Sequence, residues 1–431
     1  WEIEDNEVDK IVEEYTASED TKLDEKLFKY DILVNIAHIQ MLYEQGYLNK
    51  EEFFKIRKSL IDIYNSDIQI TTEDEDVHTK IENLVTEEIE AGKKIHTRND
   101  QILADTRLYA KKNIIDIALV TLNLIEKLIT KAEENKDLIM PGYTHMRQAM
   151  PMTAYLWLTS YAESLLDDLK LLKTAFNLND QNPLGAVAGY GTSLRIDRER
   201  TTKLLDFSKI QKNPLYCVNS RGKMELLVVS SLSQIMLDLD KLCNDLILFS
   251  THEYGFIELP KEFCTGSSIM PQKTNPDVLE ILRGRVATVI SYQHQIHLIL
   301  KNSNLGYNRE TQETKKSLMD SLEITKSSIT VLSKVIPKIH FDDHSIKDEL
   351  KRDIFAAYTI DKMVERGKPF RDAYKKVKEE KKYEKPNVDE ITNYKFDREK
   401  LEISKNVWKK EKNKILSLIE DLISIEKEHL F

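Results

Sequence analysis

The chain has 431 residues, and its 63 basic and 73 acidic residues give a formal net charge of -10. This length can bury a large core, and it favours two or three domains or one elongated helical body with smaller caps. The acidic balance argues against a protein whose main task is to coat nucleic acid or an anionic membrane surface.

The cysteine content and the lack of long apolar runs bear on the cellular compartment. Cys217, Cys243 and Cys264 are too few and too scattered for a disulfide framework, and no CxxC pair indicates a zinc or redox site. No uncharged apolar run reaches the roughly 18 residues that a membrane span needs. We therefore expect a cytoplasmic protein with neither a membrane nor a nucleic-acid partner.

Glycine and proline punctuate regular structure, so stretches without either residue predict the longest helices. Helical patterns appear first near residues 26 to 46 and 50 to 65. Stretches that lack both residues and carry apolar positions at helical spacing then follow at 93–140, 152–182, 223–254, 285–305 and 307–336. Strand signals are sparse, and only Ile68 to Thr71 alternates as a strand would. The sequence therefore predicts an all-α fold with five long helices.

The first of these long helices differs from the others in its apolar pattern. Apolar residues between Ile114 and Ile125 cover more than one helix face, so we expect this helix to be buried on most sides. Such a wide apolar girdle is hard to bury within a single subunit of five helices. This reasoning predicts that the bundle assembles into an oligomer.

Residues 264 to 277 read CTGSSIMPQKTNPD and interrupt the helical chain. Gly266 allows backbone conformations in which successive N–H groups converge on an anion. Pro276 suits the first turn of the next helix, with Asn275 as its cap. The serines and Lys273 would then lie at the partly positive N-terminal end of a helix, an arrangement that binds carboxylates.

This loop resembles the GSSxMPxKxNP signature of the fumarase and aspartase superfamily, and Gln272 gives it the form of the argininosuccinate lyases. The resemblance extends from Thr16 to Arg371. Five more segments are similar to segments of that family: DVHTKIE (76–82), HTRNDQ (96–101), MPGYTH (140–145), PLGAVAGYGTSLRIDRE (183–199) and YNRETQETK (307–315).

The resemblance implies an all-α fold of three domains, at residues 1–100, 101–344 and 345–431. It also implies a homotetramer in which the five long helices of each subunit form a core of twenty helices. Each active site would collect the regions 96–101, 140–148 and 264–280 from three different subunits. The implied reaction, which needs no cofactor, is the reversible elimination of argininosuccinate to arginine and fumarate through an aci-carboxylate intermediate.

Residue roles are likewise implied by the resemblance. Ser267 would be the base, with Lys273 and the loop amides increasing the acidity of its hydroxyl and stabilising the intermediate. His145 would pair with Glu280, which would fix the tautomer of the imidazole. His78 and Asp76 match a further site segment without an assigned role. The implied substrate-binding residues are Ser18, Arg98, Asn99, Thr144, Asn275, Tyr307, Gln312 and Lys315.

Some details stay open in the sequence. HTRNDQ is three residues shorter than the HTGRSRNDQ that is usual in the family, either because the loop is shorter or because residues are missing from the sequence. Asp20 and Asp24 compete for the aspartate that would face the guanidinium end of the substrate. His294 and His297 have metal-ligand spacing, but we interpret them as surface or interface histidines and expect no metal.

Two other functions compete with this interpretation. One is a different lyase of the superfamily, such as adenylosuccinate lyase or aspartase. The other is a non-catalytic homologue of the crystallin kind, against which the presence of Ser267, Lys273 and His145 argues.

Overall fold

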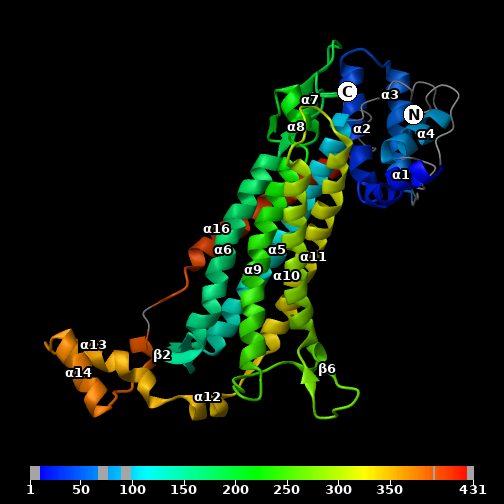
Figure 1. Cartoon of the computed structure of the whole chain (residues 1–431). Coiled ribbons are helices and arrows are strands. Elements are labelled where there is room, and N and C mark those ends of the chain that lie inside the picture. The colour runs from blue at the N-terminus through cyan, green and yellow to red at the C-terminus, as the bar shows by residue number, and fades with distance from the viewer. Residues whose placement is uncertain (1–9, 67–75, 89–98, 392–393, 425–431) are drawn as a thin grey trace.

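The computed structural model describes residues 10–66, 76–88, 99–391 and 394–424 (Figure 1). Its centre is a bundle of long helices, as the sequence predicts. These helices are α5 (Asn99–Glu134), α6 (Ala154–Asn179), α9 (Lys223–Phe249), α10 (Asp277–Leu300) and α11 (Thr314–Val335). Each falls on one of the stretches without glycine or proline, except that α10 begins before Gly284. A Cβ atom added to Gly284 would meet no atom of another segment within 4 Å, so this residue lies at an open position of the helix.

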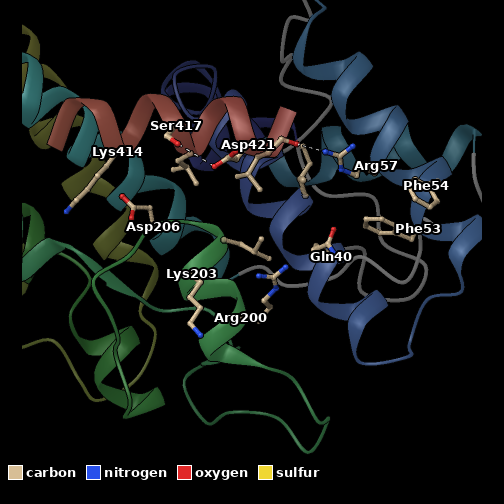
Figure 2. Close-up of a pocket in the computed structure, with 14 residues that line it drawn as sticks. Gln40, Phe53, Phe54, Arg57, Arg200, Lys203, Asp206, Lys414, Ser417 and Asp421 are labelled. Carbon is tan, nitrogen blue, oxygen red and sulfur yellow. Dashed lines mark hydrogen bonds between the residues drawn. The ribbon is translucent and has the colours of Figure 1, made fainter. Parts of the chain in front are cut away.

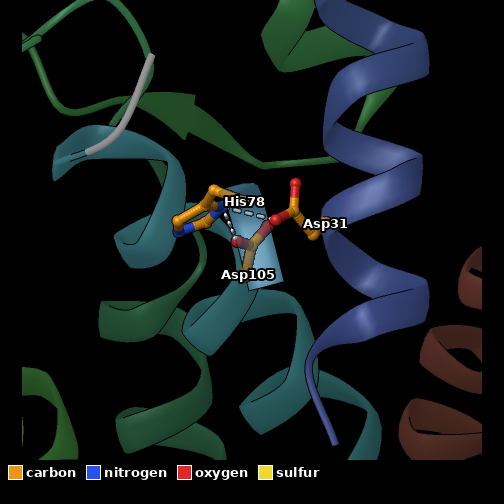
Figure 3. Close-up of side chains that lie close together, drawn as sticks. All are labelled: Asp31, His78 and Asp105. Carbon is orange, nitrogen blue, oxygen red and sulfur yellow. Dashed lines mark hydrogen bonds and ion pairs between the residues drawn. The ribbon is translucent and has the colours of Figure 1, made fainter. Parts of the chain in front are cut away.

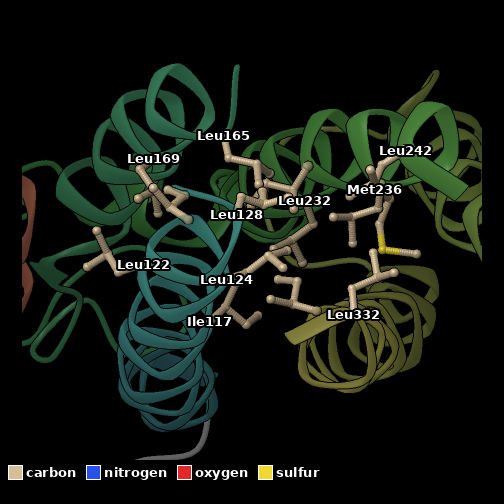
Figure 4. Close-up of a cluster of buried hydrophobic side chains, with 14 of the residues drawn as sticks. Ile117, Leu122, Leu124, Leu128, Leu165, Leu169, Leu232, Met236, Leu242 and Leu332 are labelled. Atoms are coloured by element: carbon tan, nitrogen blue, oxygen red, sulfur yellow. The ribbon is translucent and has the colours of Figure 1, made fainter. Parts of the chain in front are cut away.

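Leucine, isoleucine and methionine side chains fill the space between these helices (Figure 4). α5 lies at the centre of the packing and contacts α6, α11, α16 and α2. Its residues Ile114, Ile117, Leu124 and Ile125 are all fully buried within one chain. One chain therefore buries most of the apolar surface that the sequence suggested would be hard to bury, although Leu119 and Val120 remain partly exposed. α10, by contrast, leaves Ile281, Ile290 and Leu298 exposed.

The N-terminal helices gather at one end of the bundle (Figure 1). They are α1 (Lys10–Asp24), α2 (Phe28–Glu44), α3 (Lys50–Tyr64) and α4 (Val77–Glu88). α2 and α3 match the two predicted helical patterns. Asn49 and Glu52 form a capping box at the start of α3, which satisfies backbone N–H groups there. The short helices α7 (Arg198–Leu204) and α8 (Pro214–Asn219) lie at the same end.

The opposite end of the bundle carries two hairpins and the small helices that follow the bundle (Figure 1). The hairpins are β1 (Ile139–Thr144) with β2 (Arg147–Thr153), and β6 (Thr265–Gly266) with β7 (Thr274–Asn275), both antiparallel. The helices are α12 (Asp343–Glu349), α13 (Ala356–Glu365), α14 (Phe370–Glu380) and α15 (Val388–Ile391).

The last helix, α16 (Arg398–Ile423), runs back along the bundle, packs against α5 and α6, and reaches α2. Two short strand pairs complete the fold: β3 (Gln181–Asn182) with β4 (Lys209–Ile210), and β5 (Ile257–Glu258) with β8 (His340–Phe341). In the described part of the chain, no helix combines the length and apolar composition needed to cross a membrane.

The strands differ from the sequence prediction. The predicted strand at Ile68 to Thr71 lies outside the described residues. The β1–β2 hairpin was not predicted, because Pro141, Gly142 and Pro151 within its strands mask a strand pattern.

Candidate active site

The loop that holds Ser267 is shaped by the pairing of β6 with β7. Thr265 lies opposite Asn275 and Gly266 opposite Thr274, so the residues between them form a projecting hairpin at the start of α10. The backbone N–H groups of Met270 and Ile269 lie 3.0 and 3.3 Å from Ser267 Oγ and donate hydrogen bonds to it. Donors aimed at this oxygen stabilise it when it carries negative charge.

The helix after the loop begins one residue later than predicted. Pro276 is the N-cap residue of α10, without a side-chain cap, and Asp277 begins the helix. Asn275 does not cap the helix because its backbone is held in β7 opposite Thr265. Lys273 and Glu280 are exposed on either side of this junction.

His145 lies at the tip of the β1–β2 hairpin, between Thr144 and Arg147, which pair with each other. His145 and Met146 have φ values of 52° and 57°, so both occupy the left-handed region, as a tight hairpin turn of this kind requires. Two non-glycine residues in that region store strain, which is common at functional sites. α6 begins only at Ala154, where Thr153 caps it by accepting the N–H of Leu156 at 3.0 Å.

Thr144 and His145 are exposed and lie at the same end of the bundle as the Ser267 loop (Figure 1). Glu280, the predicted partner of His145, is also exposed in the first turns of α10. Within the described residues of one chain, neither His145 nor Glu280 has an ion-pair partner. One chain therefore does not form the predicted pair.

Lys315 lies at the other end of the bundle, in the first turn of α11. Its side chain is only 4% exposed, and its ammonium contacts Asp20 at 2.7 Å and Asp24. Asp24 also accepts the N–H of Val77 at 3.2 Å, so both of its oxygens have partners. Asp20 retains 18% of its side-chain exposure. Of the two competing aspartates, Asp20 is thus the one with a surface available to a ligand.

Burial raises the pKa of the Asp20 carboxyl, and the Lys315 ammonium opposes part of that shift. Arg221 also acts on Asp20, and its guanidinium lies 5.5 Å from the centre of the Tyr307 ring. The sequence analysis did not single out Arg221. The only hint in the sequence was that Arg221 precedes Gly222, a glycine that separates two helical stretches. In the structure, Gly222 has a φ of 79° and separates α8 from α9.

The remaining predicted binding residues are divided between the two ends. Gln312 donates to the carbonyl of Thr16 at 3.3 Å and so lies near α1, while Asn99 is the first residue of α5. Asn275 lies in the Ser267 hairpin. Arg98 and the side chain of Ser18 lie outside the described residues.

The two groups of predicted residues are too far apart in one chain to act on one substrate. α10 has 24 residues and separates the Ser267 loop from Tyr307, Gln312 and Lys315. At 1.5 Å per residue, this helix is about 36 Å long. The chain brings Ser267, Lys273 and Asn275 together and His145 to the same end, but it does not bring them to Lys315.

A buried cluster of charged side chains lies close to the Lys315 end. His78 Nδ1 is hydrogen-bonded to Asp31, and Asp105 Oδ2 lies 3.9 Å from the same nitrogen (Figure 3). Burial alone would lower the pKa of His78, but Asp31 and Asp105 raise it to about 10. These three residues offer ligand atoms within 4.8 Å of one another. Because the His78 nitrogen already donates to Asp31, we interpret the cluster as an ion pair and not as a metal centre.

A cavity of about 410 Å³ lies among α2, α3, α7 and α16 (Figure 2). Both arginines that line it already have partners in the chain. Arg200 forms a forked ion pair with Glu44, and Arg57 donates to the carbonyls of Leu422 and Ser424. None of the predicted catalytic residues lines this cavity.

Comparison with known proteins agrees with the resemblance in the sequence. Residues 4–291 match the family model described as Lyase. The argininosuccinate lyase of Thermotoga neapolitana is 40% identical over 380 residues, which cover 86% of this chain and 96% of that protein. The argininosuccinate lyase of Bacteroides fragilis is 38% identical over 379 residues, which cover 86% of this chain and 85% of that protein.

Solved structures support the fold. A crystal structure of EDDS lyase in complex with formate has a TM-score of 0.77 at 21% identity and covers 94% of each chain. A crystal structure of the fumarate lyase:delta crystallin from Brucella melitensis bound to cobalt has a TM-score of 0.73 at 19% identity, and the match covers 91% of each chain. With the identities to its relatives over most of its length, the chain belongs to the lyase family and, within it, to the argininosuccinate lyases.

Proposed function

We propose that this protein cleaves argininosuccinate reversibly to arginine and fumarate, the reaction for which its relatives are named. The observation that carries the proposal is the identity of 40% with an argininosuccinate lyase across 86% of this chain. The convergence of two backbone N–H groups on Ser267 Oγ supports it, because this reaction needs an oxygen base that tolerates negative charge.

The test is to incubate the purified protein with argininosuccinate, adenylosuccinate or aspartate and to follow the ultraviolet absorbance of fumarate. We expect turnover of argininosuccinate alone. Turnover of adenylosuccinate or aspartate instead would assign the protein to another lyase of the superfamily. Full folding without turnover of any of the three would favour the non-catalytic alternative.

In the proposed mechanism, Ser267 removes the proton from the carbon next to a carboxylate of the succinyl group. The electron pair moves into that carboxylate, which becomes the aci-carboxylate, and Lys273 and loop N–H groups stabilise its charge. The bond between the other succinyl carbon and the guanidinium nitrogen then breaks, the nitrogen keeps the electron pair and takes up a proton, and fumarate and arginine are released. His145, oriented by Glu280, is proposed to act at the same site. The mechanism requires no cofactor.

The proposed binding residues contact different parts of the substrate. Asn99 and Thr144, with Arg98 beside them, would contact the succinyl portion. Asn275, Tyr307, Gln312 and Lys315 are further proposed binding residues, Ser18 would lie near the arginine end, and Asp20 would face the guanidinium group. The partly exposed carboxylate of Asp20 beside Lys315 supports this assignment.

We further propose a homotetramer whose active sites each combine residues of three subunits. The length of about 36 Å that α10 places between the Ser267 hairpin and Lys315 supports shared sites. The exposed Ile281, Ile290 and Leu298 of α10 support an interface along the bundle.

The proposed domains are residues 1–100, 101–344 and 345–431, and the proposed compartment is the cytoplasm. The packing of α2, α3 and α4 around Ile32, Ile56 and Val77 supports an N-terminal domain, although Leu418 and Leu422 of α16 join the same hydrophobic cluster. α16 packs on the bundle, so the C-terminal domain would include a helix that contacts the central one.

A further inference from the structure

One buried ionic network borders the end of the bundle where Lys315 and Asn99 lie. It contains two cationic side chains and four carboxyl groups, none with more than 18% of its side chain exposed: Lys315, His78, Asp20, Asp24, Asp31 and Asp105. Lys315 belongs to the proposed substrate site. His78 and its partners have no role in the mechanism described above.

His78 connects three helices through this network (Figure 3). The ring belongs to α4, while Asp31 belongs to α2 and Asp105 to α5. Asp31, Asp105 and Asp76 are the carboxyl groups that act on the ring, and together they keep it protonated at neutral pH. The His78 imidazolium therefore supplies a positive charge next to the buried carboxyl groups of Asp31 and Asp105.

The first turn of α4 links His78 to Lys315. The N–H of Val77, the residue before His78, donates to Asp24 Oδ2 at 3.2 Å, and the other oxygen of Asp24 binds the Lys315 ammonium. Fixing the His78 ring therefore fixes the N–H that orients Asp24. The His78–Asp31 pair and the Lys315–Asp24 pair also interact electrostatically through Asp105. The pKa of Asp105 is raised well above its usual value by burial and by Asp31 and Asp24, while His78 and Lys315 lower it.

Asp31 provides a second link, to the start of α5. Its Oδ1 accepts hydrogen bonds from the amide of Gln101 and, at 2.7 Å, from the amide of Asn35. Gln101 lies two residues after Asn99, in the first turn of α5. The His78–Asp31 pair thus helps to hold the turn that presents Asn99.

We propose that His78, as an imidazolium, is a positioning residue that sets Lys315 and the first turn of α5 for substrate binding without touching the substrate itself. The inference rests on the proposed function, in which Lys315 and Asn99 bind the substrate. Loss of the positive charge would leave the Asp31 carboxylate without its cation in a buried site. The first turn of α4, which carries the Val77 N–H that binds Asp24, would then relax.

The first test compares His78→Gln with His38→Gln. Glutamine keeps an N–H donor for Asp31 but removes the charge. His38 is a control in α2 whose pKa burial lowers to about 4, so its ring is neutral. We expect His78→Gln to raise KM for argininosuccinate about tenfold with kcat within about twofold, the size of effect seen for coupling through a packed network. His38→Gln should leave both constants unchanged.

An unchanged KM with a lower kcat in His78→Gln would overturn the proposal, because it would indicate a purely structural role.

A double-mutant cycle tests whether His78 acts through Lys315. Adding His78→Gln to Lys315→Ala should raise KM little beyond the value of Lys315→Ala alone. Independent effects, with the two increases in KM multiplying, would contradict the proposed link.

Hydrogen–deuterium exchange of the tetramer without substrate separates this inference from the proposed function. We expect His78→Gln, and not His38→Gln, to increase exchange in peptides that cover 76–82 and 311–318. Unchanged exchange in both peptides would overturn the positioning role. Increased exchange in a protein whose wild type does not cleave argininosuccinate would reject the proposed function and leave the structural link standing.

Asp105→Asn is the second variant, in case His78→Gln does not fold. It keeps the His78–Asp31 contact but removes one carboxyl group that raises the pKa of His78. In the wild type, the positioning effect is lost only as the pH rises through about 10. In Asp105→Asn, the rise of KM should begin at a lower pH. Identical profiles of KM against pH in the two proteins would contradict the proposal.

Discussion

Ser267 and Lys315 lie beyond opposite ends of α10 in one chain, Ser267 in the hairpin before the helix and Lys315 in the first turn of α11 after it. A helix of 24 residues, about 36 Å long, stands between them. A substrate of the size of argininosuccinate cannot bridge that distance. If both residues serve the same reaction, they must come from different subunits.

Shared sites predict complementation between inactive variants. His145→Asn and Ser267→Ala should each be inactive, and subunit exchange between them should restore part of the wild-type activity, because some sites then receive neither lesion. The control mixes Ser267→Ala with Lys273→Ala, whose lesions lie in the same loop and enter the same site. Recovery in the control, or none in the first mixture after verified exchange, would argue for sites built within one chain.

Ser267→Ala should separate chemistry from binding. Loss of a general base lowers kcat by about 10²- to 10⁴-fold, while assembly and substrate binding should persist because the Ser267 side chain lies in an exposed hairpin. The measurements are steady-state kinetics and calorimetric titration with argininosuccinate. Ser268→Ala, at the exposed neighbouring position, is the matched control and should retain near-normal kcat. Near-normal kcat in Ser267→Ala would remove the proposed base.

The long helices could be predicted because local sequence determines them: an amphipathic stretch without glycine or proline has few alternatives to a helix. The β1–β2 hairpin could not be predicted, because Pro141 and Pro151 disfavour strands and are accommodated here only by their pairing in a two-stranded ribbon. The turn at His145 depends on that pairing. Its left-handed backbone therefore left no signal in the sequence.

The residues of the candidate site also fall into those that local sequence reveals and those that only tertiary packing brings together. Ser267 and Lys273 were found because their motif lies within fourteen consecutive residues, from 264 to 277. Asp31 and Asp105 were missed because each lies inside an ordinary helix, and only tertiary packing brings them to His78. The choice between Asp20 and Asp24 likewise required the Val77 N–H, which comes from another helix.

Asp20→Asn and Asp24→Asn should have different effects. Asp20 is partly exposed beside Lys315, so its loss should raise KM about tenfold or more, as expected for a hydrogen bond to a charged group. Asp24 is 1% exposed and binds both Val77 and Lys315, so its loss should lower the free energy of unfolding by about 1 to 3 kcal/mol. KM and thermal unfolding of each variant would be measured. A KM that rises in Asp24→Asn but not in Asp20→Asn would show that Asp24 is the substrate-binding aspartate and Asp20 the structural one.

Asp168, in α6, predicts a pH-dependent gain in stability. Burial and the neighbouring Asp238 raise the pKa of its carboxyl to about 7. A raised carboxyl pKa means that the folded state resists ionisation. The destabilising cost therefore begins once the unfolded carboxyl ionises above about pH 4, and it is complete by about pH 7. Asp168→Asn should thus stabilise the protein by about 1 to 2 kcal/mol above pH 7, and by much less near pH 4.

The measurement is the Tm of Asp168→Asn and of the wild type across this pH range. Asp167→Asn is the matched control, because the Asp167 side chain is 77% exposed and pairs with Lys170 on the surface. Its Tm should stay close to the wild-type curve, because Asp167 contributes less to the raised pKa of Asp168 than burial and Asp238 do. A gain in Asp168→Asn that is equal at low and high pH would contradict the prediction, because it would show that the asparagine stabilises through packing and not through the removal of a buried charge.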